Sequence, residues 1–284
     1  MIELFLDIFD GQIPFNFFFA AATEKTISLH GNRSVRINYW DRERIKQFEP
    51  TLFIHSAFLT RDKLRKSTVD EYIIANQRIT LEAEWALQLA STKRMICVSS
   101  GAARYATSAT PIASDPYGVL KFNEENCLQG ISERFKKQLL VVRVHSIMGN
   151  YIKTGDVFFV ESLINSLIEN RNFKIDSNYP VWRSYASAYE MFAFSLLGLA
   201  DGRAGIINSG GYSVELRNLA QLAKHILNSE SEIILPESKK LLLSSDYYVS
   251  ESPDLNQVAS RFGVSYTNLA GQILQTANSI LDFK

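Results

Sequence analysis

Cysteine is scarce in this sequence. Its 284 residues include two cysteines, Cys97 and Cys127. Two cysteines cannot build the disulfide framework of a small secreted protein. Cys97 stands in the apolar run of residues 95–98, where we expect a small buried hydrophobic side chain and not a reactive thiol. The low count indicates a reducing compartment, and we expect the cytoplasm.

An excess of charge of either sign is also absent. Lys and Arg total 30, and Asp and Glu total 30. No overall field attracts nucleic acid or an anionic membrane, so we expect neither partner. Residues 1–9 are apolar but carry Glu3 and Asp7 and no basic leader, so they fit neither a secretory signal nor a membrane span. Their apolar spacing predicts that the chain begins inside a helix.

Hydrophobic segments alternate with helical patterns in the first half of the chain. Hydrophobic residues make up 46% of the sequence, enough for a sizeable core. Short apolar runs predict buried strands at residues 15–22, 35–39, 51–58, 95–100 and 139–144. Helices are expected at residues 41–48, 68–89 and 117–135, and in the second of these Ile74, Leu81, Trp85 and Leu89 form an apolar stripe. Alternating strands and helices predict an α/β fold with a doubly wound parallel sheet.

The pattern changes after residue 150. Helices are expected at residues 157–168 and 189–199, and a strand at 206–208 leads into a glycine-rich turn. Ser213 is the expected N-cap of a further helix that extends to about residue 226. We expect a main domain over residues 1–150 and a smaller C-terminal lobe over 151–284.

A serine, a tyrosine and a lysine form the candidate chemical group. Ser100 ends an apolar strand, and ligands of parallel sheets bind at the carboxyl ends of strands. Tyr117 and Lys121 open the next helix, where a spacing of four places them on one face. An ammonium stabilises a nearby phenolate, and a serine hydroxyl can hold a substrate oxygen against the phenol. Such a group can move a proton while hydride is exchanged with a nicotinamide cofactor.

These residues, in this order, resemble the extended short-chain dehydrogenases/reductases, the NAD-dependent epimerase/dehydratase group that modifies nucleotide sugars. The likeness extends from about Val35 to near the C-terminus. It implies a Rossmann-like first domain, a substrate lobe, NAD or NADP as cofactor, with NAD favoured, and a homodimer. Ser100, Tyr117 and Lys121 match the family's catalytic residues. Family cofactor contacts fall at Asn38, Ala57, Asn76, Tyr117, Lys121, Val144 and His145.

The substrate contacts that the resemblance implies are Ser146 and Arg183. Arg183 matches an arginine that grips the substrate pyrophosphate, and a guanidinium fork suits that role. The segment 101–105 lacks the acidic pair that dehydration calls for, so we expect an epimerase or a 4-keto reductase.

The family's first strand and its glycine-rich phosphate loop have no counterpart in this sequence. Gly11 is the only glycine among the first thirty residues. The opening segment is expected to be the helix that follows that loop in the family, and without the loop we expect weak cofactor binding. The alternative hypothesis is a non-catalytic descendant that serves as a binding or regulatory module.

Other chemistries have weaker signals. The four histidines are His30, His55, His145 and His225, and no two have metal-ligand spacing, so no metal is expected. His55 lies on an apolar strand and is interpreted as a core residue, whereas His145 at a strand end can face either the ligand crevice or the core. Ser99 and Ser100 lack the Gly-x-Ser-x-Gly elbow of serine hydrolases.

Overall fold

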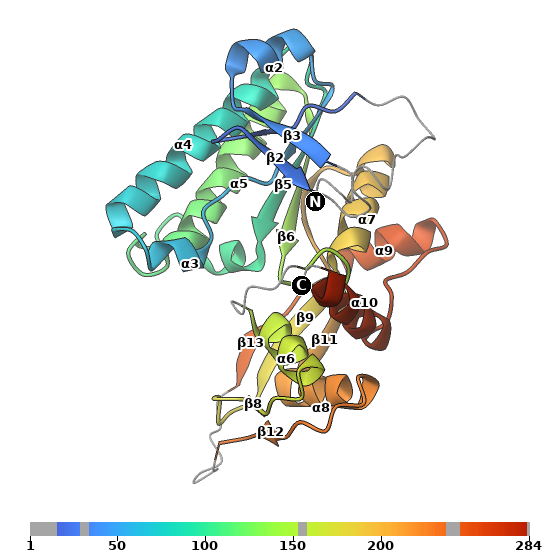
Figure 1. The fold of residues 1–284 in the computed structure, drawn as a ribbon. Helices are drawn as coiled ribbons and strands as arrows, with labels where there is room; N and C mark the ends of the chain where they lie inside the picture. The colour runs from blue at the N-terminus through green and yellow to red at the C-terminus, as the bar shows by residue number, and fades with distance from the viewer. Residues whose placement is uncertain (1–15, 29–33, 153–157, 237–244, 283–284) are drawn as a thin grey trace. The chain divides into compact units, whose positions relative to one another are not determined.

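The computed structural model describes residues 16–28, 34–152, 158–236 and 245–282 (Figure 1). Its strands are β1 (Ala20–Ala21), β2 (Lys25–Ser28), β3 (Ser34–Tyr39), β4 (Leu52–His55), β5 (Arg94–Ser100), β6 (Gln138–Val144), β7 (Ser146–Met148), β8 (Phe173–Lys174), β9 (Val181–Ser187), β10 (Gly205–Asn208), β11 (Tyr212–Glu215), β12 (Ile233–Ile234) and β13 (Asp246–Tyr248). Its helices are α2 (Arg42–Phe48), α3 (Arg61–Leu64), α4 (Val69–Gln88), the 3₁₀ helix η2 (Gly101–Tyr105), α5 (Pro116–Phe135), α6 (Phe159–Ile168), α7 (Ala188–Ala200), α8 (Leu216–Ile226), α9 (Asp254–Arg261) and α10 (Leu269–Asp282).

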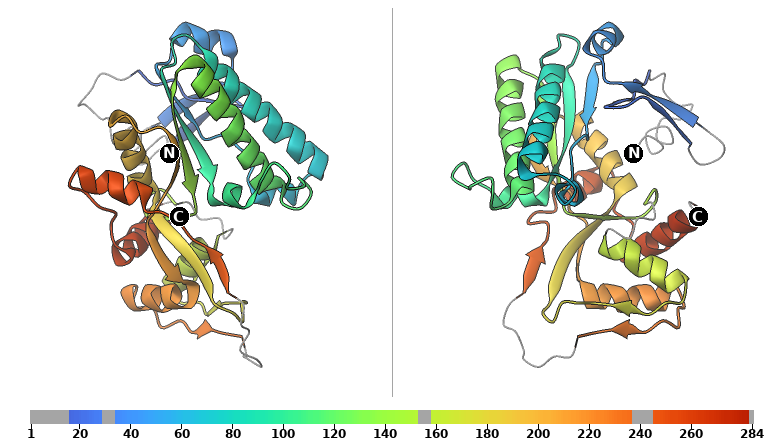
Figure 2. Two further views of the ribbon diagram at one scale, coloured as in Figure 1. Left: turned by 180° about the vertical axis from the view of Figure 1, so that it is seen from behind. Right: turned by 60° about the vertical axis from the view of Figure 1, so that its left-hand side comes forward.

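The α/β fold that the sequence predicts is confirmed. A parallel sheet has the strand order β10-β6-β5-β4, and β4 pairs with β5 from Leu52 opposite Arg94 to His55 opposite Cys97. A separate sheet has the order β1-β3-β2, in which β1 is parallel and β2 antiparallel to β3. Helices α4 and α5 lie side by side in both figures (Figure 2).

The two long helices have well-defined starts. Thr68 caps α4 in a capping box, in which its side chain accepts from the Glu71 N–H while Glu71 reaches back to the Thr68 N–H. Pro116 occupies the first turn of α5, where its missing N–H costs nothing. Both helices pack against a core formed by Ala83, Ala86, Leu87, Met95, Cys97, Leu128, Leu139 and Val141. Cys97 is fully buried, as expected.

The chain divides into two compact units. The first unit comprises Met1–Ser99, Ala103–Val141 and Asp201–Ile206. The second comprises Ser100–Ala102, Val142–Ala200 and Ile207–Lys284. The boundary expected at residue 150 remains a prediction.

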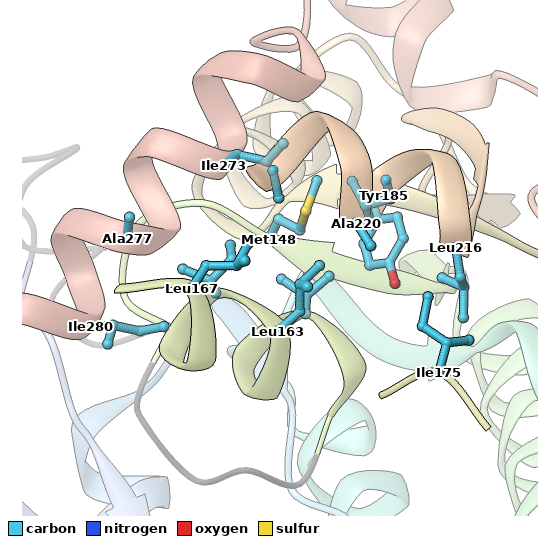
Figure 3. Packing of buried hydrophobic residues seen from close by; sticks show 14 of the residues in the cluster. Met148, Leu163, Leu167, Ile175, Tyr185, Leu216, Ala220, Ile273, Ala277 and Ile280 are labelled. Atoms are coloured by element: carbon cyan, nitrogen blue, oxygen red, sulfur yellow. The ribbon is translucent and has the colours of Figure 1, made fainter. Parts of the chain in front are cut away.

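The second unit has its own sheet and core. Strands β11 (antiparallel), β13 (parallel) and β7 (parallel) all pair with β9, and β12 pairs with β8 in a small two-stranded sheet. Figure 3 shows side chains of α6, α8 and α10 that point toward one another, with Leu163, Ala220 and Ile273 among them, and they share a core with Tyr185 of β9. Burying this apolar surface stabilises the unit.

Three local predictions are wrong. A buried strand is expected at residues 15–22; within its described part, residues 16–22, the strand is limited to Ala20–Ala21, and Phe17 is exposed. Ser213 lies in β11, and the N-cap of α8 is Glu215, whose carboxylate accepts from the Arg217 and Asn218 N–H groups. Ile74 and Leu81, from the expected apolar stripe of α4, are 48% and 56% exposed.

The helix expected near residues 2–9 lies outside the described residues. Among the residues that the structure describes, no helix is long and apolar enough to cross a membrane.

Candidate active site

Tyr117 and Lys121 share one aromatic neighbour in the first unit. The Phe58 ring meets the Tyr117 ring edge-on, with centroids 5.9 Å apart. The Lys121 Nζ lies 3.7 Å from the centroid of the same ring. Phe58 comes from the segment after β4, so the end of that strand reaches the first turns of α5. The predicted placement of both side chains on one helix face agrees with this shared contact.

Three partners surround the Lys121 ammonium. It donates to the Val98 carbonyl oxygen at 2.9 Å and to Glu124 Oε2 at 2.8 Å, and it lies over the Phe58 ring. An ammonium has three protons, and these contacts can engage all of them. Lys121 is 3% exposed. The resemblance did not predict that Lys121 pairs with a carboxylate.

Glu124 is the centre of a buried polar network. Its Oε1 lies 2.9 Å from His55 Nε2 and accepts from the Thr80 hydroxyl at 3.3 Å. Its side chain is completely buried. Burial alone would raise the pKa of this carboxyl, but the Lys121 charge and the His55 hydrogen bond outweigh burial and lower the pKa to about 2. Glu124 is therefore ionised at neutral pH.

One group of side chains could approach a metal ion. Ligand atoms of His55, Cys97 and Glu124 lie within 4.8 Å of one another, and all three residues are buried. The spacing of the histidines did not reveal this group, because its members come from β4, β5 and α5. Lys121 already neutralises the Glu124 carboxylate, and a metal ion would have to displace that ammonium. We therefore assign the three side chains to the ion-pair network.

Stability should depend on pH through Glu124. Its pKa is about 2 in the folded chain against an ordinary value of 4.5. A lowered carboxyl pKa stabilises the fold above the unfolded value, and this contribution is lost as pH falls from about 5 toward 2. Two and a half pH units correspond to about 3 kcal/mol. Urea unfolding at pH 6 and pH 3 should show about 2 kcal/mol of this loss in the wild type, because pH 3 still lies above the folded pKa, and should not show it in Glu124→Gln. Equal pH dependence in both proteins would contradict the assignment.

Tyr117 has charged neighbours at the start of α5. The Arg61 guanidinium lies 5.3 Å from the Tyr117 ring centroid, and Arg61 also pairs with Asp115 at 2.9 Å. The Tyr117 side chain is half-buried, and its hydroxyl makes no hydrogen bond to a residue that the structure describes. A phenol in this state can take up a hydrogen bond from a ligand.

Asn76 organises the segment after β4. It is fully buried, and its Oδ1 accepts from the Leu59 N–H at 2.8 Å while its amide donates to the Leu59 carbonyl at 3.4 Å. The Tyr72 hydroxyl donates to the same carbonyl, and burial raises the pKa of Tyr72 to about 12. Asn76 therefore supports the segment after β4. Ala57, which is exposed, lies in the same segment, two residues before Leu59.

The amide of Asn38, the expected adenine contact, has two partners in the first unit. It donates to the Phe19 carbonyl at 3.1 Å and accepts from Arg44 at 3.2 Å.

Ser100 belongs to the second unit, where its partner is Tyr248. The two hydroxyl oxygens are 2.9 Å apart, and the Tyr248 hydroxyl also lies 3.3 Å from the Val144 carbonyl, to which it can donate. The Ala102 N–H donates to Ser100 Oγ at 3.3 Å. Sequence reasoning missed Tyr248, which lies 148 residues from Ser100 and carries no local motif.

His145 packs beside the same tyrosine. Its ring centroid lies 5.2 Å from that of Tyr248, and its Nδ1 is 3.5 Å from the Ser209 hydroxyl. A Cβ added to Gly101 would lie 2.5 Å from the His145 ring, so the backbone needs a glycine there. Ser146, the next residue, is in β7 opposite Tyr185.

Arg183 lines a pocket of the second unit. It donates to Asp246 at 2.7 Å and to the Trp182 carbonyl at 2.8 Å, and its guanidinium lies 5.9 Å from the Tyr248 ring. The pocket has a volume of about 360 Å³, and its lining includes Phe158, Phe173, Lys174, Arg183 and Asp246. An aromatic wall beside a guanidinium suits a ligand with a flat ring and an anionic group.

Two groups of candidate residues thus emerge. Tyr117 and Lys121 contact the same ring in the first unit. Ser100 and His145 both contact Tyr248 in the second unit, and the Arg183 guanidinium faces that ring as well.

Comparison with known proteins finds solved structures that share the fold of this chain. No family model matches the sequence, and no curated protein matches it. Among solved structures, UDP-glucose 4-epimerase from Thermotoga maritima with UDP-glucose has a TM-score of 0.66 at 16% identity, over 88% of this chain and 85% of that one. UDP-glucuronic acid 4-epimerase from Bacillus cereus with UDP-glucuronic acid and NAD has a TM-score of 0.67 at 13% identity, over 87% and 82%.

RMD from Pseudomonas aeruginosa, complexed with NADPH, is similar as well. Its TM-score is 0.64 at 20% identity, over 81% of each chain. These likenesses confirm the resemblance at the level of the fold. The chain therefore shares its fold with these solved structures, two of which are UDP-sugar 4-epimerases.

Proposed function

We propose that the protein is an NAD(P)-dependent enzyme that epimerises or reduces a nucleotide-linked sugar. The observation that carries this proposal is the contact of Tyr117 and Lys121 with one ring, Phe58, in a fold shared with nucleotide-sugar epimerases. In the proposal Tyr117 exchanges a proton with a sugar hydroxyl, and Ser100 orients the substrate oxygen. The segment 101–105 carries no acid, which favours epimerase or reductase over dehydratase.

A nicotinamide dinucleotide fits part of the first unit. The Tyr117 hydroxyl makes no hydrogen bond to a described residue and Ala57 is exposed, so both are available to a ligand. Asn38, Val144 and His145 remain proposed cofactor contacts, and Asn76, whose buried amide is hydrogen-bonded to Leu59, would support the segment that carries Ala57. When bound, the nicotinamide would accept or donate hydride. We favour NAD over NADP because, among the similar solved structures, three are described as complexes with NAD and one as a complex with NADPH.

The proposed substrate site is the pocket that contains Arg183. Its guanidinium can grip a pyrophosphate with parallel N–H donors, at the cost of weakening its pair with Asp246. Phe158 and Phe173 offer faces for a nucleobase. Ser146 is the further proposed substrate contact.

Titration with cofactor and substrate tests this function. Calorimetry with NAD and NADP should give heat. Incubation of UDP-glucose or UDP-glucuronic acid with NAD should yield the 4-epimer if the enzyme is an epimerase, and incubation of a 4-keto nucleotide sugar with NADH or NADPH should yield the reduced sugar if it is a reductase. No heat and no thermal shift at millimolar cofactor would overturn the proposal.

A second candidate function is a non-catalytic binding module. The observation that favours it is the Lys121–Glu124 ion pair. In the family this lysine is expected to bind the cofactor, but here its ammonium is already bonded to Glu124. Binding of a UDP-sugar without binding of NAD or NADP would select this alternative.

We also propose a homodimer, with the cytoplasm as compartment. Val69, Ile74 and Leu81 are large apolar side chains that α4 exposes to solvent. Leu81→Glu should shift sedimentation toward the monomer, because a carboxylate would be buried in the interface. Val264→Glu, at an exposed apolar position of the second unit, is the control and should leave sedimentation unchanged. A Leu81→Glu protein that sediments like the wild type would exclude α4 as the interface.

A further inference from the structure

The buried pair of Lys121 and Glu124 conflicts with a cofactor-holding role for Lys121. Side chains of the two residues are 4% and 0% exposed, and their charged atoms are 2.8 Å apart. Val98 and the Phe58 ring complete the surroundings of the ammonium. A cofactor ribose could bind Lys121 only after one of these contacts opened.

Opening this pair is unfavourable for a physical reason. A carboxylate in the protein interior is stable only while a cation and hydrogen bonds compensate for its lost hydration. His55 and Thr80 are the partners of Glu124 Oε1, and the Lys121 ammonium is the partner of Oε2. Withdrawing the ammonium toward a ligand would leave Oε2 with only the weak Cys97 thiol contact at 3.9 Å.

We infer that Glu124 is a positioning residue that anchors Lys121 in a buried ion pair and withholds it from a nicotinamide dinucleotide. Lys121 connects α5 to β5 through its hydrogen bond to the Val98 carbonyl. Glu124, also on α5, connects the helix to β4 through His55. The choice of ligand rests on the proposed function, whereas the anchoring does not. The resemblance assigns Lys121 to the cofactor and gives no role to Glu124.

Other polar groups surround the pair without replacing it. The neighbouring carboxylate, Glu125, accepts from the Ser99 hydroxyl. Arg61 and Asp115 pair with each other at the N-terminal end of α5. Glu125→Gln is consequently a matched control, because it removes a buried carboxylate from the same helix.

Binding of NADH tests whether Glu124 withholds Lys121. We expect Glu124→Gln to bind NADH about tenfold more tightly than the wild type, since one charge-assisted hydrogen bond becomes available to the ribose. Adding Lys121→Met should abolish that gain, and Glu125→Gln should show none. A Glu124→Gln protein that binds NADH no more tightly than the wild type would overturn the inference.

Thermal denaturation without ligand tests the anchoring. Lys121→Met removes the ammonium partner of the buried Glu124 carboxylate and should lower Tm by roughly 10 °C. The double variant Lys121→Met/Glu124→Leu replaces the pair by apolar groups and should recover to within a few degrees of the wild type. An unchanged Tm in Lys121→Met would contradict a structural ion pair.

The same double variant distinguishes the two roles of Lys121 even if Glu124→Gln does not fold. Under the inference it binds NADH as the wild type does, whereas a cofactor-holding Lys121 predicts a loss of tenfold or more. None of these measurements uses a sugar substrate. If the proposed function is wrong but the anchoring is right, nucleotide sugars will not be turned over, while Lys121→Met will still lower Tm and the double variant will still restore it.

Discussion

Tyr117→Phe should lower kcat by about a thousandfold while leaving the Kd for cofactor nearly unchanged, because positioned acid–base groups contribute on the order of 10²–10⁴. The substitution removes only the hydroxyl that would exchange the proton. Its ring would keep the edge-on contact with Phe58 and the Arg61 guanidinium above it, so the local packing should persist. Steady-state kinetics of nucleotide-sugar turnover and calorimetry with NAD provide the two measurements.

Tyr39→Phe is the control for this experiment. Tyr39 ends β3 in the same unit, and its side chain is 56% exposed. The Tyr39→Phe protein should retain the wild-type kcat. Loss of cofactor binding in Tyr117→Phe would mean that this phenol holds the cofactor and is not the proton-exchanging group. Unimpaired turnover would remove Tyr117 from the chemistry.

The long elements could be predicted from sequence because their signals are local. Residues 95–100 and 139–144 are apolar and β-branched, and they form β5 and β6 within one residue of the expected bounds. The capping box at Thr68 marks the start of α4 directly in the sequence. Where a local signal was ambiguous, tertiary structure decided: Ser213 resembles an N-cap, but its pairing opposite Ser184 makes it part of β11.

The candidate site could be predicted only in part, because some of its contacts are local in sequence and others join distant segments. The spacing of Tyr117 and Lys121 is enough to place them on one helix face. Glu124 follows Lys121 by three residues, a spacing that allows an ion pair on any helix, so the local signal existed. Its other partners come from β4 and α4, and sequence alone does not show that they meet there. The contact of Ser100 with Tyr248 is equally non-local.

Gly211→Ala should destabilise the second unit by about 4 kcal/mol or more, a loss in the range caused by strain and overpacking together. Gly211 has φ of 91°, which disfavours any side chain. An added Cβ would also lie 2.2 Å from the Tyr185 carbonyl oxygen, a backbone atom of β9 that cannot move aside without disturbing the sheet. The Gly211 N–H additionally donates to Asn256 Oδ1 at 2.9 Å, which fixes the turn from the other side.

Gly263→Ala separates the two causes of this loss. Gly263 lies in the same unit with φ of 71°, but an added Cβ there would meet no atom within 4 Å. Its substitution should therefore cost only the conformational strain, about 1 kcal/mol. Calorimetric unfolding of both variants measures the difference. Equal losses would mean that the turn before β11 can shift away from β9, and that the close approach of Gly211 to Tyr185 is not what requires a glycine.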